Sequence, residues 1–226
     1  MELRLDDMKR LILFLAIALL TASASFAQKD WAGFGRYAED NKTVTVRPKA
    51  VFFGDSITDA WGRNSSGFFV SNNFVGRGIS GQTTSEMLVR LRADVLELHP
   101  KYMVLLAGIN DIAMNNGKIS VEQTFGNIVS MVELCKLYKI KPVLCTVFPT
   151  TDIPWRKEVP DVSARIGELN TLIRDYARKH HIKCVDYFPP ECYTDGRLNP
   201  EFSKDGVHPN GQGYTIMQET ILKVLK

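Results

Sequence analysis

The sequence predicts an α/β fold: a three-layer α/β/α sandwich around a five-stranded parallel sheet. Short apolar runs alternate with longer stretches of helical period along most of the chain. The runs are continuously apolar, which is typical of strands covered on both faces, as in parallel sheets. The composition, with 45% hydrophobic and 23% charged residues, is ordinary for a globular protein.

The length of 226 residues fits one or at most two domains, and no repeat or low-complexity tract divides the sequence. We therefore expect one domain over residues 50–226. Residues 28–49 mix aromatic and charged side chains without a clear period, so we expect an N-terminal arm lying against that domain. The 28 basic and 25 acidic side chains leave a net charge of +3. So small a charge predicts no nucleic-acid partner.

Residues 1–27 have the pattern of a secretory signal peptide. Met8-Lys9-Arg10 supplies a basic start, residues 11–20 are an unbroken apolar run, and Ser25-Phe26-Ala27 offers small residues for cleavage. The apolar run is too short to span a bilayer, so an uncleaved membrane anchor is the weaker alternative. We expect an exported protein, periplasmic or secreted, with no stable membrane insertion after cleavage.

Export makes the four cysteines candidates for disulfides. Cys135 lies in a helical pattern, Cys145 and Cys184 lie in strand-like runs, and Cys192 lies in a loop. Three full pairings, a single bridge or none are all compatible with the spacing. For three of the four we expect the role of a small buried hydrophobe.

Five strands and four helices are expected in alternation. The strands are expected at residues 50–53, 74–76, 102–106, 142–148 and 182–187, and the helices at 83–98, 120–138, 161–180 and 212–225. The first two helices open with Thr83-x-x-Glu86 and Ser120-x-x-Gln123, which are typical of capping boxes. Asp161 is the expected cap of the third. Strand–helix alternation of this kind predicts right-handed crossovers within one sheet.

The segments that carry chemistry follow the strands, because function in open α/β sheets gathers at the carboxyl ends of strands. They are Gly54-Asp55-Ser56-Ile57-Thr58, Gly78-Ile79-Ser80-Gly81-Gln82-Thr83, Gly108-Ile109-Asn110-Asp111 and, before the last helix, Asp205-Gly206-Val207-His208-Pro209.

A serine hydroxyl becomes a nucleophile when a base takes its proton and an acceptor holds that base in one tautomer. His208 and Asp205 are three residues apart, so one turn of chain can present both toward Ser56. The oxyanion that forms then needs preorganised donors. The backbone N–H groups of Ser56 and Gly81 and the side-chain amide of Asn110 are the expected supply.

These four segments resemble the blocks of the GDSL, or SGNH, hydrolase family, in the same order and over residues 54–208. The correspondence falls on Ser56, Gly81, Asn110, Asp205 and His208, and Ile57 stands where the family name has leucine. The resemblance implies a flavodoxin-like domain of the SGNH hydrolase fold. It also implies hydrolysis of esters, and sometimes thioesters, without a metal or organic cofactor.

Each of these residues also has a structural interpretation. Ser56 fits the N-cap of a following helix, Asn110 fits a turn, and His208 fits a loop histidine beside Pro209. Asp205 and His208 suit a metal, but no third ligand has a fitting spacing. The structural interpretations would require that all four segments resemble catalytic blocks by chance. We therefore favour the catalytic interpretation.

Three rival functions remain to be compared. An α/β-hydrolase needs Gly-x-Ser-x-Gly, and here Thr58 is in the fifth position. A flavodoxin-like cofactor binder is weakly supported, because residues 54–58 lack both the Walker lysine and Gly-x-Gly-x-x-Gly. A catalytically silent glycan-binding module would use exposed aromatics, although the same residues equally suit a packed arm: Trp31, Phe34, Tyr37, Trp61 and Trp155.

The expected substrate is a small-molecule or glycan ester with a short acyl group, most specifically a carbohydrate O-acetyl ester. Little of the chain is left over for a lid that would cover a long acyl chain. Exported members of the family that this chain resembles include enzymes that remove acetyl groups from carbohydrates. A lysophospholipase or thioesterase is the alternative. The flanking loops are polar and contain Arg63, Asn64, Gln82, Arg156 and Lys157.

Overall fold

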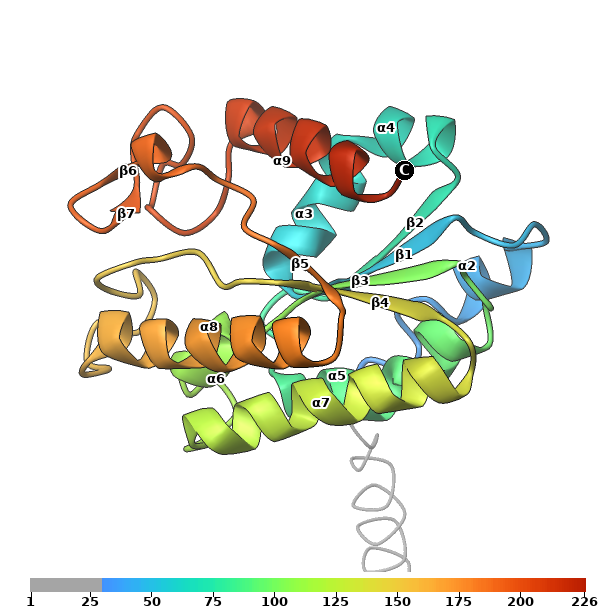
Figure 1. Ribbon diagram of the computed structural model, residues 1–226, viewed down its shortest axis with the longest axis horizontal. Coiled ribbons are helices and arrows are strands. Elements are labelled where there is room, and N and C mark those ends of the chain that lie inside the picture. Colours follow the sequence, from blue (N-terminus) through green and yellow to red (C-terminus); the bar gives the residue numbers. More distant parts are fainter. Residues whose placement is uncertain (1–29) are drawn as a thin grey trace, which may run out of the picture. The chain divides into compact units, whose positions relative to one another are not determined.

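Five parallel strands form the central sheet, in the order β2-β1-β3-β4-β5 (Figure 1). Their bounds are β1 Ala50–Gly54, β2 Phe74–Gly78, β3 Tyr102–Leu106, β4 Lys141–Cys145 and β5 Lys183–Val185. The computed structural model describes residues 30–226, of which residues 32–226 form one compact unit. Strand β1 lies in the interior of the sheet and pairs in register with both β2 and β3. The predicted α/β/α fold with a five-stranded parallel sheet is confirmed.

The continuous apolar runs arise because both faces of the sheet are covered. In β1, Val51 and Phe53 belong to one buried cluster, whereas Ala50 and Phe52 belong to another on the opposite face. Alternate residues of a strand point to opposite faces, so a strand buried on both sides needs apolar residues throughout.

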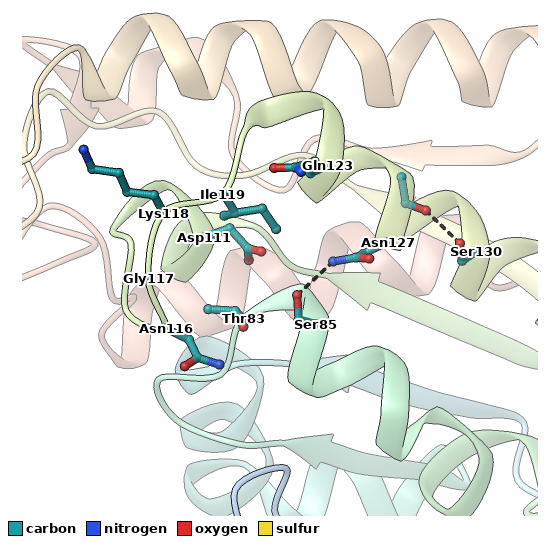
Figure 2. Close-up of a pocket in the computed structure, with 11 residues that line it drawn as sticks. Thr83, Ser85, Asp111, Asn116, Gly117, Lys118, Ile119, Gln123, Asn127 and Ser130 are labelled. Carbon is teal, nitrogen blue, oxygen red and sulfur yellow. Dashed lines mark hydrogen bonds between the residues drawn. The ribbon is translucent and has the colours of Figure 1, made fainter.

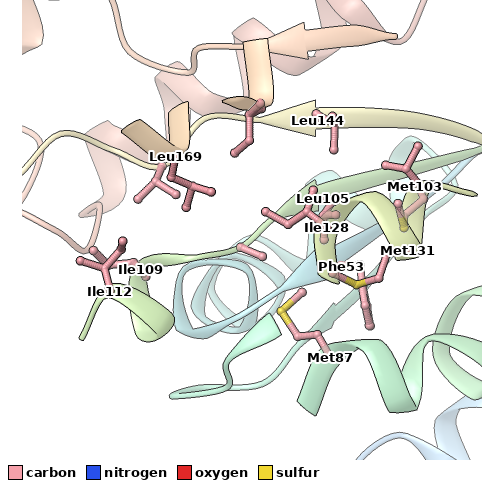
Figure 3. Packing of buried hydrophobic residues seen from close by; sticks show 14 of the residues in the cluster. Phe53, Met87, Met103, Leu105, Ile109, Ile112, Ile128, Met131, Leu144 and Leu169 are labelled. Atoms are coloured by element: carbon pink, nitrogen blue, oxygen red, sulfur yellow. The ribbon is translucent and has the colours of Figure 1, made fainter. Parts of the chain in front are cut away.

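One face is covered by α5 (Thr84–Leu91), α7 (Val121–Leu137) and α8 (Val162–Lys179) (Figure 1). The side chains that pack there are mainly aliphatic (Figure 3), and they include Phe53, Met87, Met103, Leu105, Ile128, Met131, Leu144 and Leu169. The opposite face is covered by α3 (Ser56–Asn64), α4 (Ser66–Ser71) and α9 (Gly211–Val224). That cluster is aromatic, with Trp61 in contact with Phe52, Phe69 and Tyr187.

Most predicted boundaries agree with the structure to within two residues, and three differences from the predictions are instructive. Thr83 and Ser120 form the predicted capping boxes. Asp161 was expected to cap α8, but it adopts a left-handed conformation (φ 55°) and its side chain makes no capping bond. The expected helix over 83–98 is α-helical only to Leu91 and continues as a π-helical turn, Arg92–Leu96.

The third exception is β4, which ends at Cys145 although the apolar run continues to residue 148. Beyond the strand, the backbone of Val147 bonds to the side chain of Asn170 in α8, which accepts from its N–H and donates to its carbonyl at 2.8 Å each. The side-chain amide of Asn170 thus takes the hydrogen bonds that a neighbouring strand would otherwise make with Val147. A hydrophobicity pattern does not reveal that the strand ends there. The remaining short elements are α2 (Ala38–Thr43), α6 (Ile109–Ile112), a 3₁₀ turn (Pro190–Cys192), β6 (Tyr193–Thr194) and β7 (Arg197–Leu198).

The segment from Ala32 to β1 makes specific contacts with the sheet edge. The Tyr37 hydroxyl donates to the carbonyl of Gly78, and the amide of Asn41 donates to Asp94 at 2.9 Å. The Gln82 amide donates to the carbonyl of Ala32 at 2.7 Å. The signal peptide expected at residues 1–27 lies outside the described residues. Within residues 30–226, no helix has both the length and the apolar character needed to cross a bilayer.

All four cysteines are free thiols. Cys135, Cys145 and Cys192 are buried, whereas Cys184 is exposed. Three of the four cysteines are thus buried, as expected, and Cys184 is the exposed one. Strand β5, which carries Cys184, is the edge of the sheet, so fewer elements cover it than cover β1 or β3.

Candidate active site

Ser56 is the first residue of α3 and lies at the carboxyl end of the interior strand β1. The helix N-cap is Asp55, whose carboxylate accepts from the backbone N–H of Ile57 at 3.1 Å. The interpretation of Ser56 as the N-cap is therefore wrong: its neighbour caps the helix, and the Ser56 hydroxyl is available to another partner. Burial raises the pKa of Asp55 to about 6, although its bond from Ile57 opposes the shift.

The partner of Ser56 is His208. Its Nε2 lies 2.9 Å from Ser56 Oγ, and its Nδ1 lies 2.7 Å from Asp205 Oδ2. The other oxygen, Asp205 Oδ1, accepts from the backbone N–H groups of Val207 and His208 at 3.0 and 2.8 Å. A carboxylate on Nδ1 favours the tautomer with the proton there, which leaves Nε2 to accept from the serine hydroxyl. Residues more than 150 positions apart thus form one hydrogen-bonded chain.

The charge state of Asp205 suits this arrangement. Partial burial on its own raises the pKa of Asp205, but hydrogen bonds from the His208 backbone and ring and from Val207 outweigh that cost. The pKa of Asp205 therefore lies below its ordinary value, and the carboxylate stays ionised at neutral pH. Ser203 supports the loop by donating to the carbonyl of His208 at 2.8 Å.

Gly81 lies in the turn after β2 and has a φ of +81°. A Cβ atom built on Gly81 would meet no protein atom within 4 Å. The need for glycine at this position therefore comes from its left-handed backbone, which other residues adopt only at a cost, and not from crowding by the protein itself.

Asn110 lies in α6, is buried, and has both ends of its amide engaged. Its Nδ2 donates to the carbonyl of Gln82 at 3.0 Å, and its Oδ1 accepts from Asn115 Nδ2 at 2.8 Å. An amide nitrogen carries two hydrogens, so one of them remains for a ligand in this fixed orientation. Asn110 is thereby tied to the turn that contains Gly81.

A buried ion pair lies beneath the same turn and was not predicted. Arg90 in α5 and Asp94 in the π-helical turn that follows it are bonded at 2.8 Å, and both are fully buried. Arg90 also donates to the carbonyl oxygens of Gly54 at 3.0 Å and Arg77 at 3.1 Å and to the side chain of Gln82. One guanidinium thus joins the carboxyl ends of β1 and β2 to the turn before α5. Its only sequence signal is an Arg/Asp pair at helical spacing, which usually indicates an exposed pair.

Asp111, next to Asn110, has a different environment. It is fully buried and accepts from the backbone N–H and hydroxyl of Thr84, at 2.9 and 2.6 Å. Burial raises the pKa of Asp111 to about 6, and the bonds from Thr84 only partly oppose it. Asp111 joins α6 to the start of α5 and contacts neither Ser56 nor His208 through a hydrogen bond in the described part of the chain.

Two hollows lie near these residues. The larger, of about 540 Å³, is polar and opens between α5 and α7 (Figure 2); it is lined by Thr83, Ser85, Asp111, Asn116, Gly117, Lys118, Ile119, Gln123, Gly126, Asn127 and Ser130. Its lining includes none of Ser56, Asp205 and His208. The smaller, of about 10 Å³, is mainly apolar, and its lining includes both neighbours of Ser56 and the residue before His208: Asp55, Ile57, Leu106, Ala107, Ile109, Val147, Phe148 and Val207.

Near the site lie Trp155, one of the aromatics considered for glycan binding, and Asn115, which was not predicted. The Trp155 ring lies 5.3 Å from the His208 ring, centroid to centroid, and its Nε1 donates to Asn115 Oδ1 at 3.1 Å. Among the aromatics expected to be exposed, Trp61 and Tyr37 are in fact buried. Within residues 30–226, no group of three His, Cys, Asp or Glu side chains is placed to hold a metal ion.

Residues 52–216 match the GDSL-like Lipase/Acylhydrolase family, and the chain belongs to that family. The family groups the protein with enzymes that hydrolyse esters. The predicted family and the predicted class of enzyme are confirmed.

Solved structures agree with this assignment. The chain is 42% identical to a GDSL-like lipase from Bacteroides thetaiotaomicron, with a TM-score of 0.82, over 87% of this chain and 98% of that one. It also shares its fold with a mutant of an acetylxylan esterase from Geobacillus stearothermophilus, at a TM-score of 0.64 and 19% identity, over 79% of this chain and 94% of that one.

Among curated proteins, the chain is similar to the isoamyl acetate-hydrolyzing esterase 1 homolog of Bos taurus. The two are 26% identical over 151 residues, which is 59% of this chain and 61% of the bovine protein. The chain spans between 33% and 61% of the length of the curated relatives it matches.

Proposed function

We propose that the protein is a serine esterase with Ser56 as nucleophile, His208 as general base and Asp205 as the residue that orients the base. The observation that carries the proposal is the continuous hydrogen-bonded chain from Ser56 Oγ to His208 Nε2 and from His208 Nδ1 to Asp205 Oδ2, at 2.9 and 2.7 Å. Membership of an acylhydrolase family supports the same reaction.

In the first half-reaction, Ser56 Oγ attacks the acyl carbon of the ester while His208 Nε2 takes the hydroxyl proton. The imidazolium is stabilised by the ionised carboxylate of Asp205. It then gives its proton to the departing alcohol oxygen as the acyl–oxygen bond breaks. In the second half-reaction, water replaces the alcohol, loses a proton to His208 and releases the acid from Ser56.

The negative oxygen of each tetrahedral intermediate needs donors that are already in place. We assign these to the N–H groups of Ser56 and Gly81 and to the remaining hydrogen of Asn110 Nδ2. The fixed amide of Asn110 supports this assignment, because neither end of it has to reorient when charge develops. The first N–H groups of α3 have no acceptor within the helix, which also suits an anion there.

For the substrate we propose a short acyl group on a small-molecule or glycan alcohol, most specifically a carbohydrate O-acetyl ester. The apolar hollow lined by the two neighbours of Ser56 argues against a long acyl chain, since about 10 Å³ holds at most one water-sized group. The shared fold with an acetylxylan esterase is compatible with the carbohydrate part. A lysophospholipase or thioesterase activity is the alternative that the test separates.

We further propose that the protein is exported, with residues 1–27 removed and residues 50–226 forming the hydrolase domain. The basic start, apolar run and small residues at positions 25–27 support export. N-terminal sequencing of the protein recovered from outside the cytoplasm tests this, and a chain that retains residue 1 in the cytoplasm contradicts it.

A fluorophosphonate probe tests the nucleophile directly, because it reacts with activated serines and needs no knowledge of the substrate. We expect labelling of the wild type at Ser56 and none of Ser56→Ala. Labelling of Ser56→Ala to the same extent contradicts the proposal, and absence of labelling in both favours a catalytically silent module.

Hydrolysis rates for p-nitrophenyl acetate, butyrate and octanoate then test the acyl group. Each buried methylene is worth about 0.8 kcal/mol, so a site built for long chains gains specificity steeply with chain length. We expect acetate to be preferred, and release of acetate from acetylated xylan. Preference for octanoate without release of acetate from any sugar overturns the acetylesterase proposal and leaves the serine esterase intact.

A further inference from the structure

Asn115 contacts two of the residues that we assign to the oxyanion hole, Asn110 and Gly81. Its Nδ2 donates to Asn110 Oδ1 at 2.8 Å and to the carbonyl of Gly81 at 3.3 Å. Its backbone N–H donates to the carbonyl of Asn110 at 3.0 Å. Met114, with a φ of +56°, provides the turn that brings Asn115 back toward Asn110 after α6. The orientation of Asn110 therefore depends on Asn115.

The remaining polar atom of Asn115 binds the loop that follows β4. Asn115 Oδ1 accepts from Trp155 Nε1 at 3.1 Å. That loop is anchored by Ile153, which is fully buried, and by Thr151, whose hydroxyl accepts from Arg197 at 2.9 Å. Trp155 is thus held on a fixed loop and through its own N–H, while its side chain remains 38% exposed.

The position of Trp155 places it on the alcohol side of the proposed site. In the reaction above, the histidine that accepts the serine proton donates it to the departing alcohol, so the alcohol oxygen must lie beside His208 Nε2. Trp155 packs on the His208 ring at 5.3 Å with an interplanar angle of 42°. The acyl oxygen lies instead toward Gly81 and Asn110. Trp155 therefore borders the part of the ester that leaves as the alcohol.

We propose that Trp155 forms the recognition surface for a ring-shaped alcohol, such as a pyranose carrying an acetyl ester. We propose also that Asn115 is a positioning residue that fixes Trp155 and Asn110 relative to each other. The inference rests on the proposed serine esterase function. An indole whose N–H is already bonded offers a large, rigid, partly exposed apolar face, which suits the C–H face of a sugar ring. The side-chain amide of Asn115 then sets the distance between Trp155, which contacts the alcohol, and Asn110, which stabilises the oxyanion.

The alternative is that Trp155 only packs against His208 and holds its ring. The two interpretations differ in what a substitution changes. A packing role affects every ester equally, because His208 serves each of them. A recognition role affects esters of ring alcohols and spares an ester whose alcohol is too small to reach Trp155.

The experiment compares two acetyl esters, ethyl acetate and a mono-O-acetyl methyl xyloside, with the full chain. We expect Trp155→Ala to lower kcat/KM for the xyloside about 3- to 10-fold more than for ethyl acetate, since aromatic contacts of this kind carry energies of that size. Trp155→Phe keeps a ring face and should restore most of the difference. Trp155→Leu keeps apolar volume without a ring and replaces Trp155→Ala if that variant does not fold.

Asn115→Ala should lower kcat for ethyl acetate about tenfold with little change in KM, because the oxyanion contact matures in the transition state. It should lower kcat/KM for the xyloside further, because Trp155 loses the acceptor of its Nε1–H. The matched control is Glu158→Gln in the same loop, whose exposed side chain pairs with Arg156 and should leave both esters unchanged.

Equal losses for both esters in Trp155→Ala overturn the recognition role. An Asn115→Ala variant with an unchanged kcat for ethyl acetate overturns the positioning role. The esterase proposal survives either result. Full activity of Ser56→Ala on both esters is the separate outcome that contradicts the esterase itself.

Discussion

Two carboxylates at the same edge of the sheet, Asp205 and Asp111, have opposite titration behaviour. Asp205 is partly exposed and faces an imidazole, and its pKa is lowered. Asp111 is fully buried and accepts from the backbone N–H and hydroxyl of Thr84, and its pKa is raised to about 6. Both accept short hydrogen bonds from backbone N–H groups, so the presence of such bonds does not by itself explain the difference.

Access to water and the kind of partner explain it. Around Asp205, several hydrogen bonds and a group that can become cationic outweigh a moderate desolvation cost. Around Asp111, desolvation is nearly complete and the partners are neutral. The comparison indicates that Asp205 is suited to stabilise a charge that appears during a reaction, whereas Asp111 is suited to hold two elements together.

The largest loss of esterase turnover is expected when Ser56 or His208, the pair that Asp205 supports, is substituted. Ser56→Ala should lower esterase turnover on the order of 10⁴-fold or more, because the base then has no hydroxyl to activate. His208→Ala should have a similar effect, and the double variant should be hardly worse, since residues acting as a unit are non-additive. Turnover with p-nitrophenyl acetate and circular dichroism of the folded variants measure this. Retention of a tenth of the wild-type turnover by Ser56→Ala would sink the assignment.

The pair Asp205→Asn and Asp111→Asn tests the comparison itself. An amide at position 205 can no longer favour the required histidine tautomer, so turnover should fall about 10³- to 10⁴-fold. Asp111→Asn should lower turnover far less, because Asp111 is not bonded to the histidine. Turnover and melting temperature are measured together for both variants. A comparable loss of turnover in Asp205→Asn and Asp111→Asn would show that the two carboxylates do not have different roles in the reaction.

Asn110→Ala should come next in size. Loss of one oxyanion donor typically costs about 10²- to 10³-fold in turnover. Because the bond matures in the transition state, kcat should fall while KM changes little. Steady-state kinetics distinguish this from a ground-state contact, which would raise KM and leave kcat unchanged.

The smallest effect concerns stability and pH. Asp55 and Asp111 have folded pKa values of about 6 against an ordinary 3.8, so the folded state binds more protons than the unfolded state between those values. Their stabilising contribution is present below pH 3.8 and is lost as the pH rises toward 6, at about 1–3 kcal/mol for each carboxyl. Asp205, with its lowered pKa, acts in the opposite direction and below pH 3.8.

Denaturant unfolding at a series of pH values measures this dependence. The free energy of unfolding of the wild type should decrease between pH 4 and 6. In Asp111→Asn this decrease should be smaller by the contribution of one carboxyl. An unchanged slope in that variant would show that Asp111 titrates normally in the folded protein.

Much of the fold follows from local patterns. The strands at residues 50–54 and 102–106 were predictable because β1 and β3 are interior strands, covered on both faces and therefore apolar throughout. The caps at Thr83 and Ser120 depend on residues three positions apart, which a sequence displays directly. Asp161 shows the limit of such patterns, because a capping residue needs an extended backbone and Asp161 is left-handed.

Some residues of the candidate site could likewise be identified from the sequence, whereas others could not. Ser56, Gly81, Asn110, Asp205 and His208 were identified from their types, order and spacing. Asn115 was not assigned a role, and Trp155 was considered only as one of several aromatics that suit glycan binding or a packed arm. The place of Trp155 at the site depends on a partner 40 positions away, Asn115, which the sequence does not display. The Arg90–Asp94 pair has the same spacing as an exposed helical pair, and only the surrounding packing buries it.

The sequence by itself determined the layered α/β class, the family and the residues that supply the proposed chemistry, since these depend on periodicity and on short segments with fixed spacing. The tertiary structure decided which side chains meet, which carboxylate stays ionised and which aromatic borders the site. The physical reason is that pKa values, burial and ring contacts depend on distances between segments, and those distances exist only once β1, the turn after β2, α6 and the loop before α9 converge on one edge of the sheet.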